Sequence, residues 1–161
     1  MVSTVDQELI NSLYRTAEGS DPERLDVLRA HGSTRRLYRL GTPDRTVIGV
    51  VNDDVAENAA FLSFSKHFRS EGLSVPEIYA VNPERTAYLE EDLGDETLFD
   101  ALSDWRRQAA GGIPEAMTLA YEAVVRELPR FQITAGKGID DSVCYPRSSF
   151  DRQSMFWDLN Y

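Results

Sequence analysis

Residues 88–94 (Tyr-Leu-Glu-Glu-Asp-Leu-Gly) constrain the fold most, because an apolar stretch runs directly into an acidic corner closed by glycine. Tyrosine and leucine favour a sheet strand, whereas the acidic residues and the glycine mark its end. A helical pattern begins a few residues later, and Asp92 and Asp95 are alternative caps for that helix. A strand that leaves its sheet here carries backbone C=O and N–H groups without ladder partners.

Four further strand patterns precede this corner, with a helix pattern after the third. The stretch 25–30 follows an Asp-Pro helix signal but alternates like a strand, and we assign it as a strand because two strand patterns follow it. The predicted strands are residues 25–30, 34–40, 46–51, 75–81 and 86–91, and the predicted helices are residues 5–18, 55–70, 97–107, 114–131 and 150–161.

These patterns predict an α+β fold with a five-stranded antiparallel sheet and an inserted helix. The first three strands form a meander and the last two form a hairpin. Phe61, Phe64 and Phe68 give the inserted helix an apolar stripe toward the sheet. From residue 95 the pattern is helical, so we divide the chain into residues 1–94 and 95–161.

Composition excludes several classes of function. The chain has 161 residues and a formal net charge of −10, which disfavours nucleic-acid binding. No apolar run is long enough for a membrane span, and we expect no membrane partner. The single cysteine, Cys144, excludes an internal disulfide and suits a cytoplasmic location. With two lysines against fifteen arginines, a phosphate site must use arginine or backbone N–H groups.

The last residues, from Trp157 to Tyr161, are rich in large apolar side chains. We expect the chain to be the first part of a longer protein, with residues 95–161 as the first helices of a truncated second lobe. The helix over 150–161 is then expected to be exposed and to promote self-association.

Three stretches carry a resemblance to a known family: residues 32–40 (Gly-Ser-Thr-Arg-Arg-Leu-Tyr-Arg-Leu), residues 72–78 (Gly-Leu-Ser-Val-Pro-Glu-Ile), and residues 89–94 with Thr97 and Leu98. Because these stretches occur in this order and spacing, the chain resembles the amino-terminal lobe of the aminoglycoside phosphotransferase and choline kinase family, which has a protein-kinase-like fold. It looks most like bacterial kinases of N-acetylmuramate or related amino sugars. The likeness covers residues 25–107 and extends loosely to residue 161.

The resemblance implies that the turn at residues 32–36 covers the phosphates of a nucleotide. Its contacts are then Ser33, Thr34, Arg35 and Arg36, through hydroxyl, backbone and guanidinium donors. The alternative is a plain hairpin turn with solvated arginines. The turn lacks the full G-x-G-x-x-G pattern of protein kinases.

A glutamate on the inserted helix normally pairs with a third-strand lysine in this fold. Glu57 stands where that glutamate is expected, but residues 46–51 contain no lysine. A functional Glu57 therefore needs an arginine partner, for which Arg36 and Arg39 are the candidates. The alternative is a capping box, because Asp54 precedes Glu57 by three residues.

At the acidic corner the resemblance implies a hinge for the nucleotide base, formed by Glu90, Glu91 and Asp92, with backbone atoms of the first two as the contacts. Residues 92–94 also imitate the Asp-Phe-Gly metal motif of kinases. We reject that assignment because no catalytic loop precedes it. The chain therefore supplies no catalytic or metal-binding residue of its own.

The parent protein is expected to transfer the γ-phosphoryl group of ATP to a hydroxyl of a small molecule, with a sugar as the expected acceptor. ATP is the expected cofactor, and Mg²⁺ is expected only with the missing second lobe. This chain alone is expected to be inactive. The alternatives are a non-catalytic kinase-like or α+β binding module and a fragment of an aminoglycoside phosphotransferase.

Overall fold

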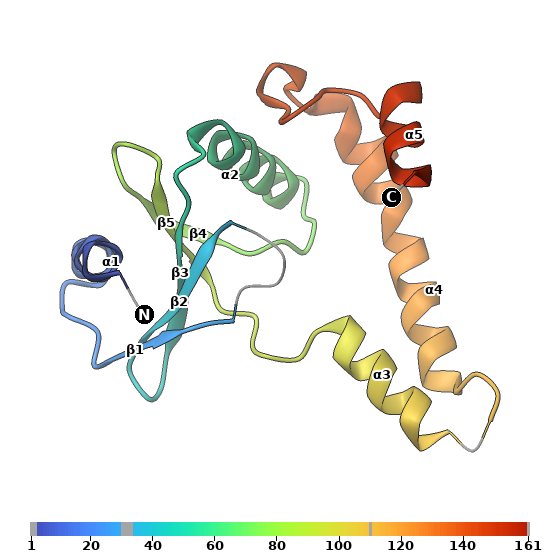
Figure 1. Cartoon of the computed structure of the whole chain (residues 1–161), viewed down its shortest axis with the longest axis horizontal. Coiled ribbons are helices and arrows are strands. Elements are labelled where there is room, and N and C mark those ends of the chain that lie inside the picture. Colours follow the sequence, from blue (N-terminus) through green and yellow to red (C-terminus); the bar gives the residue numbers. More distant parts are fainter. Residues whose placement is uncertain (1–2, 30–33, 110, 161) are drawn as a thin grey trace.

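The computed structural model describes residues 3–29, 34–109 and 111–160, and within them the chain has an α+β fold (Figure 1). A five-stranded antiparallel sheet is covered by helix α1 on one face and by helix α2 on the other. The elements are α1 (Thr4–Glu18), β1 (Arg24–Val27), β2 (Arg36–Gly41), β3 (Thr46–Val51), α2 (Val55–Ser70), β4 (Ile78–Val81), β5 (Ala87–Glu91), α3 (Leu98–Gln108), α4 (Glu115–Pro129) and α5 (Arg152–Leu159).

The strand order is β1-β2-β3-β5-β4, with every neighbouring pair antiparallel. The predicted meander, hairpin and inserted helix are thereby confirmed. The first and fourth strands are shorter than predicted, since β1 ends at Val27 and β4 begins at Ile78. The hairpin that follows α2 joins the sheet through β5, which pairs with β3, and β4 lies at the edge. The corner that follows β5 therefore leaves from the interior of the sheet.

Helix α1 packs on one face of the sheet through Ile10, Leu13 and Tyr14. These side chains pack against every second residue of β2, β3 and β5, for example Leu40 of β2. Gly49 allows this close approach, because an added Cβ would lie 2.8 Å from both Ile10 Cγ2 and Leu40 Cδ1. A side chain at Gly49 would therefore force Ile10 and Leu40 out of their present positions.

Helix α2 packs against the opposite face. Ile48, Val50 and Tyr88 are buried there, and Phe61 stacks on Tyr88 with ring centroids 5.3 Å apart. The predicted phenylalanine stripe does not face the sheet along its whole length. Phe68 instead contacts Phe131, beyond α4, edge-on, with ring centroids 5.1 Å apart. The two faces of the sheet thus have different covers, and α2 also carries contacts to residues beyond the sheet.

Residues 95–109 and 111–160 form an extended helical arm, in which α4 is the most prominent element (Figure 1). Helix α4 ends at Pro129, which cannot donate a backbone hydrogen bond, and a π-helical turn (Arg130–Thr134) continues the chain. Among the described residues of the arm, only Met117 and Ala135 are buried apolar residues. Large apolar side chains of α4 and α5 are exposed, so the arm has very little core of its own.

Besides an ion pair between Arg39 and Asp95 where the arm begins, the described parts of the arm contact the sheet domain along α2. Tyr145 Oη donates to Asp54 at the start of α2 (2.6 Å), and Arg130 donates to the carbonyl of Gly72 just beyond its end (3.2 Å). Between them His67 Nε2 lies 2.7 Å from the carbonyl oxygen of Ala135. Helix α2 is therefore the common support of both parts of the chain.

Candidate functional site

The first component of the site is an ion pair at the start of α2. Arg35 donates to Glu57 Oε1 at 2.8 Å, and Asn52 Nδ2 donates to Glu57 Oε2 at 3.1 Å. Both side chains of the ion pair are half-buried. The partner predicted for Glu57, Arg36 or Arg39, is wrong, because the arginine that reaches α2 is Arg35.

The alternative role of Glu57 as a capping-box residue is also not formed. Asp54 is the N-cap of α2 and accepts from the backbone N–H groups of Ala56 (3.1 Å) and Glu57 (3.0 Å). The N–H of Asp54 donates to Asn52 Oδ1 at 3.2 Å. The cap is therefore complete without the carboxylate of Glu57, which turns toward Arg35.

Arg36 points to the opposite face of the sheet from Arg35, since adjacent residues of a strand alternate. Its guanidinium donates to Asp6 of α1 at 2.6 Å and to Asp53 at 3.2 Å. Tyr38 Oη also donates to Asp6 at 2.8 Å, and burial together with this hydrogen bond raises the pKa of Tyr38 to about 12. Arg36 thus fastens α1 to β2, and the structure separates it from Arg35 and Glu57.

Of the other two residues predicted in the phosphate turn, Thr34 is exposed at the end of the described part of the turn. Ser33 lies outside the described residues.

Asp92 fixes the acidic corner to the sheet. Its carboxylate accepts two hydrogen bonds from Arg39, at 2.6 and 2.9 Å, one from Thr46 Oγ1 at 2.6 Å, and one from the N–H of Gly94 at 3.0 Å. Burial raises the pKa of Asp92, but these donors outweigh it and the net direction is downward. Asp95 also accepts from Arg39 at 2.7 Å but is exposed.

Neither aspartate caps the following helix, which corrects both alternatives. The N-cap of α3 is Thr97, which forms a capping box with Asp100. Asp92 is instead the counter-charge of a half-buried arginine on β2, so its role is to hold the corner in place.

Glu91 is anchored at the outer strand. Its N–H donates to the carbonyl of Glu77 at 2.8 Å, and its carboxylate accepts from the N–H of Glu77 at 3.2 Å. The backbone donor of Glu91 is therefore already used within the sheet. Leu93, two residues later, lies outside the strand with its side chain 69% exposed. The N–H of Glu91, which the sequence predicts as a contact for a nucleotide base, is therefore already occupied by the carbonyl of Glu77.

The side chain of Glu90 is the second component of the site. It lies on β5 between Ile48 of β3 and Ile78 of β4, on the α2 face of the sheet. Burial raises the pKa of Glu90 to about 7, although the positive charge of Arg35 opposes this. The Oε2 atom of Glu90 and the hydroxyl of Tyr88 are buried without a hydrogen-bond partner among the described residues.

The geometry thus brings together Arg35, Glu57 and Glu90 on the α2 face, with Asp92 at its border. From the sequence, Glu90 was expected to contribute only its backbone, and neither Asn52 nor Tyr88 was expected at the site. The signal for Tyr88 and Glu90 was their two-residue spacing, which places both on one face of a strand. That this face of β5 is the one covered by α2 follows only from the packing of the structure.

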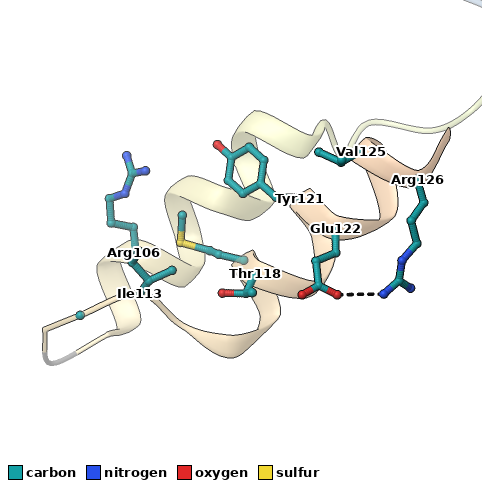
Figure 2. A pocket seen from close by; sticks show the side chains of 9 residues that line it. Arg106, Ile113, Thr118, Tyr121, Glu122, Val125 and Arg126 are labelled. Atoms are coloured by element: carbon teal, nitrogen blue, oxygen red, sulfur yellow. Dashed lines mark hydrogen bonds and ion pairs between the residues drawn. The ribbon is translucent and has the colours of Figure 1, made fainter. Parts of the chain in front are cut away.

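A pocket with a volume of about 560 Å³ lies elsewhere, between α3 and α4 (Figure 2). Met117, Tyr121 and Val125 give it an apolar lining, and Glu122 pairs with Arg126 at its edge. None of the predicted site residues contributes to it. The lining of this pocket is apolar, like the exposed faces of the arm. The pocket contains no cluster of chemically reactive side chains.

No family model matches this chain, and no curated protein does. Among the described residues, no group of three or more His, Cys, Asp and Glu side chains is placed to hold a metal ion. None of the described helices combines the length and apolar character needed to cross a membrane.

Proposed function

We propose that residues 1–94 form the nucleotide-binding lobe of a phosphotransferase that acts on a small-molecule hydroxyl, with ATP as donor and a sugar as acceptor. The ion pair between Arg35 and Glu57 carries this proposal. In protein-kinase-like enzymes, a basic side chain on the sheet binds the α- and β-phosphates and is held by a glutamate of the following helix. In this proposal Glu57 takes the role of that glutamate on α2, and Arg35, the residue before β2, supplies the positive charge.

An arginine suits this task in a chain poor in lysine. A guanidinium has five N–H donors in a fixed plane, so it can bind a carboxylate and a phosphate at the same time. Asn52 holds the second oxygen of Glu57 and thereby fixes the carboxylate. The pair is half-buried, which strengthens its attraction for an anion relative to bulk water.

The acidic corner supplies the base site of the same cleft. Asp92 joins the corner to β2 and β3 through Arg39 and Thr46, so the backbone of residues 92–94 is held in one position. Fixed backbone donors and acceptors bind a planar base at a lower entropic cost than mobile ones. The strand order, with α2 inserted between β3 and β4, supports a kinase-like lobe for residues 1–94.

Acid–base and metal chemistry belong, in this proposal, to a second lobe of which residues 95–161 are the beginning. We therefore expect this chain to bind nucleotide weakly and to transfer no phosphoryl group by itself.

A titration of the ¹⁵N-labelled chain with ADP, followed by NMR, tests the proposal. We expect shifts at residues 34–36, 57 and 90–94, and an affinity for ADP that is weaker by a factor of about ten or more in Arg35→Ala. Arg45→Ala is the matched control, because Arg45 pairs with Glu18 on the exposed surface. Absence of binding at millimolar ADP, or shifts confined to the α3–α4 pocket, would contradict the proposal.

The second candidate is a non-catalytic binding module, and the lack of lysine in β3 favours it. In that case Arg35 and Glu57 only connect the turn before β2 to α2. The same titration separates the two candidates, because a module without a nucleotide site shows no response to ADP while Arg35→Ala still lowers stability.

A further inference from the structure

Glu90 has an environment that its role in the sheet does not explain. Its cross-strand neighbours on both sides are isoleucines, and its Oε2 atom is buried without a partner among the described residues. A buried carboxyl oxygen that forms no hydrogen bond costs free energy, so its presence in a folded protein calls for an explanation such as a functional role. Phe61 and Tyr88, which stack on the same face, provide no donor to it among the described residues.

The position of Glu90 indicates which part of a ligand it meets. It is the residue before Glu91 and Asp92, where the chain leaves the sheet, and its side chain lies on the α2 face with Arg35. A base held by the backbone of the corner would therefore turn one edge toward the carboxyl of Glu90. The phosphates would lie farther along the face, toward Arg35 and Glu57.

We propose that Glu90 selects the purine base, by accepting a hydrogen bond from the 6-amino group of adenine and disfavouring purines with a 6-oxo group. This selection rests on the proposed nucleotide site and defines its specificity. An ionised carboxylate only accepts hydrogen bonds. The 6-amino group of adenine donates, whereas O6 of guanine or hypoxanthine accepts, so the second pairing places two acceptors together.

The titration of Glu90 provides an independent signature. The positive charge of Arg35, before β2, acts on Glu90, and Tyr88 on β5 lies in the field of both Glu90 and Glu57 of α2. The cross-strand neighbours of Glu90 on β3 and β4 are Ile48 and Ile78. Burial raises the pKa of Glu90 to about 7. Below that pH the protonated carboxyl can donate to O6, so discrimination against a 6-oxo base should decrease as the pH falls.

The test compares ADP with IDP, whose base carries a 6-oxo group and an N1–H in place of the 6-amino group and the unprotonated N1 of adenine; the change in the ADP-to-IDP ratio on mutation of Glu90 isolates the contribution of its side chain. At pH 8 we expect the unmodified chain to prefer ADP about 10- to 100-fold, the range expected when a buried polar pair is mismatched. Glu90→Gln should reduce this preference to a few-fold, because a carboxamide can either donate or accept. Glu77→Gln is the control, since Glu77 lies beside the same strands with an exposed carboxylate and should keep the preference.

The outcomes distinguish the nucleotide site from the role of Glu90 within it. If neither nucleotide binds, the proposed function fails. If ADP binds at residues 90–94 but Glu90→Gln leaves the ADP-to-IDP ratio unchanged, the role of Glu90 fails while the nucleotide site remains. Should Glu90→Gln not fold, the pH dependence of the unmodified chain is the test. An ADP-to-IDP affinity ratio that stays constant between pH 6 and pH 8 would overturn the inference.

Discussion

Arg35 donates a hydrogen bond of 2.8 Å to Glu57, and this pair joins the residue before β2 to the first turn of α2. Because the two side chains are half-buried, the pair is worth more than an exposed ion pair, whose median contribution is below about 1 kcal/mol. We expect a coupling free energy of about 1 kcal/mol between Arg35→Ala and Glu57→Gln in a double-mutant cycle of urea unfolding. Additive effects would show that the pair contributes no interaction energy.

Asp92 should be more important for stability than its neighbour Asp95, although both accept hydrogen bonds from Arg39. Asp92→Asn removes the counter-charge of a half-buried guanidinium, so we expect a loss of about 2–3 kcal/mol in the free energy of unfolding. Asp95→Asn changes an exposed partner and should cost less than about 0.5 kcal/mol. Equal urea midpoints for the two variants would contradict this assignment.

Glu90 should make the stability of the chain fall as the pH rises. Its pKa is about 7 in the folded chain, against an ordinary value of 4.5, so between these values the folded state binds more protons than the unfolded state. Its stabilising contribution is therefore complete below about pH 4.5 and is lost progressively up to about pH 7. Over this window we expect about 2–3 kcal/mol of destabilisation relative to Glu90→Gln. Parallel pH profiles of the two proteins in urea unfolding would exclude this effect.

Gly49 should not tolerate a larger side chain. An alanine Cβ would lie 2.8 Å from both Ile10 Cγ2 and Leu40 Cδ1, whose side chains are fully buried, so both side chains would have to shift against their neighbours. We expect Gly49→Ala to lower the free energy of unfolding by about 1–3 kcal/mol. Gly136→Ala is a suitable comparison, because its nearest contact is at 3.6 Å. Thermal unfolding followed by circular dichroism measures both, and equal losses in the two variants would contradict the role of Gly49.

The exposed apolar surface of α5 should promote association of the isolated chain. Trp157 is 59% exposed and Leu159 is 80% exposed, with Met155 and Phe156 beside them. We expect Phe156→Glu combined with Leu159→Lys to lower the weight-average mass in sedimentation velocity at high concentration. A chain that is already monomeric at several milligrams per millilitre would contradict this expectation.

The elements of the sheet domain could be predicted from the sequence because their periodicities are strong and their ends carry clear signals. Thr46–Val51 is almost continuously β-branched, and α2 begins at Asp54, a good N-cap. The length of β1 could not be predicted as well, because Leu28 continues the apolar character of the strand but lies beyond its ladder.

The site could be predicted only in part, because side-chain direction depends on register. Arg35 and Arg36 are adjacent and chemically identical, yet they point to opposite faces and bind different partners. Which of them meets Glu57 depends on the geometry of the turn before them, and composition cannot supply it. Asp92 pairs with Arg39, 53 residues earlier, and this contact follows only from the strand order.

Helix α2 is held at both ends by the arm, through Tyr145 and Asp54 at its start and through Arg130 and Gly72 beyond its end. A helix of sixteen residues is a stiff rod, and its first turn carries Glu57. A displacement of residues 130–145 would therefore be passed along α2 to its first turn, where Glu57 pairs with Arg35. Binding at the arm would in this way move Glu57, and with it the phosphate end of the proposed nucleotide site.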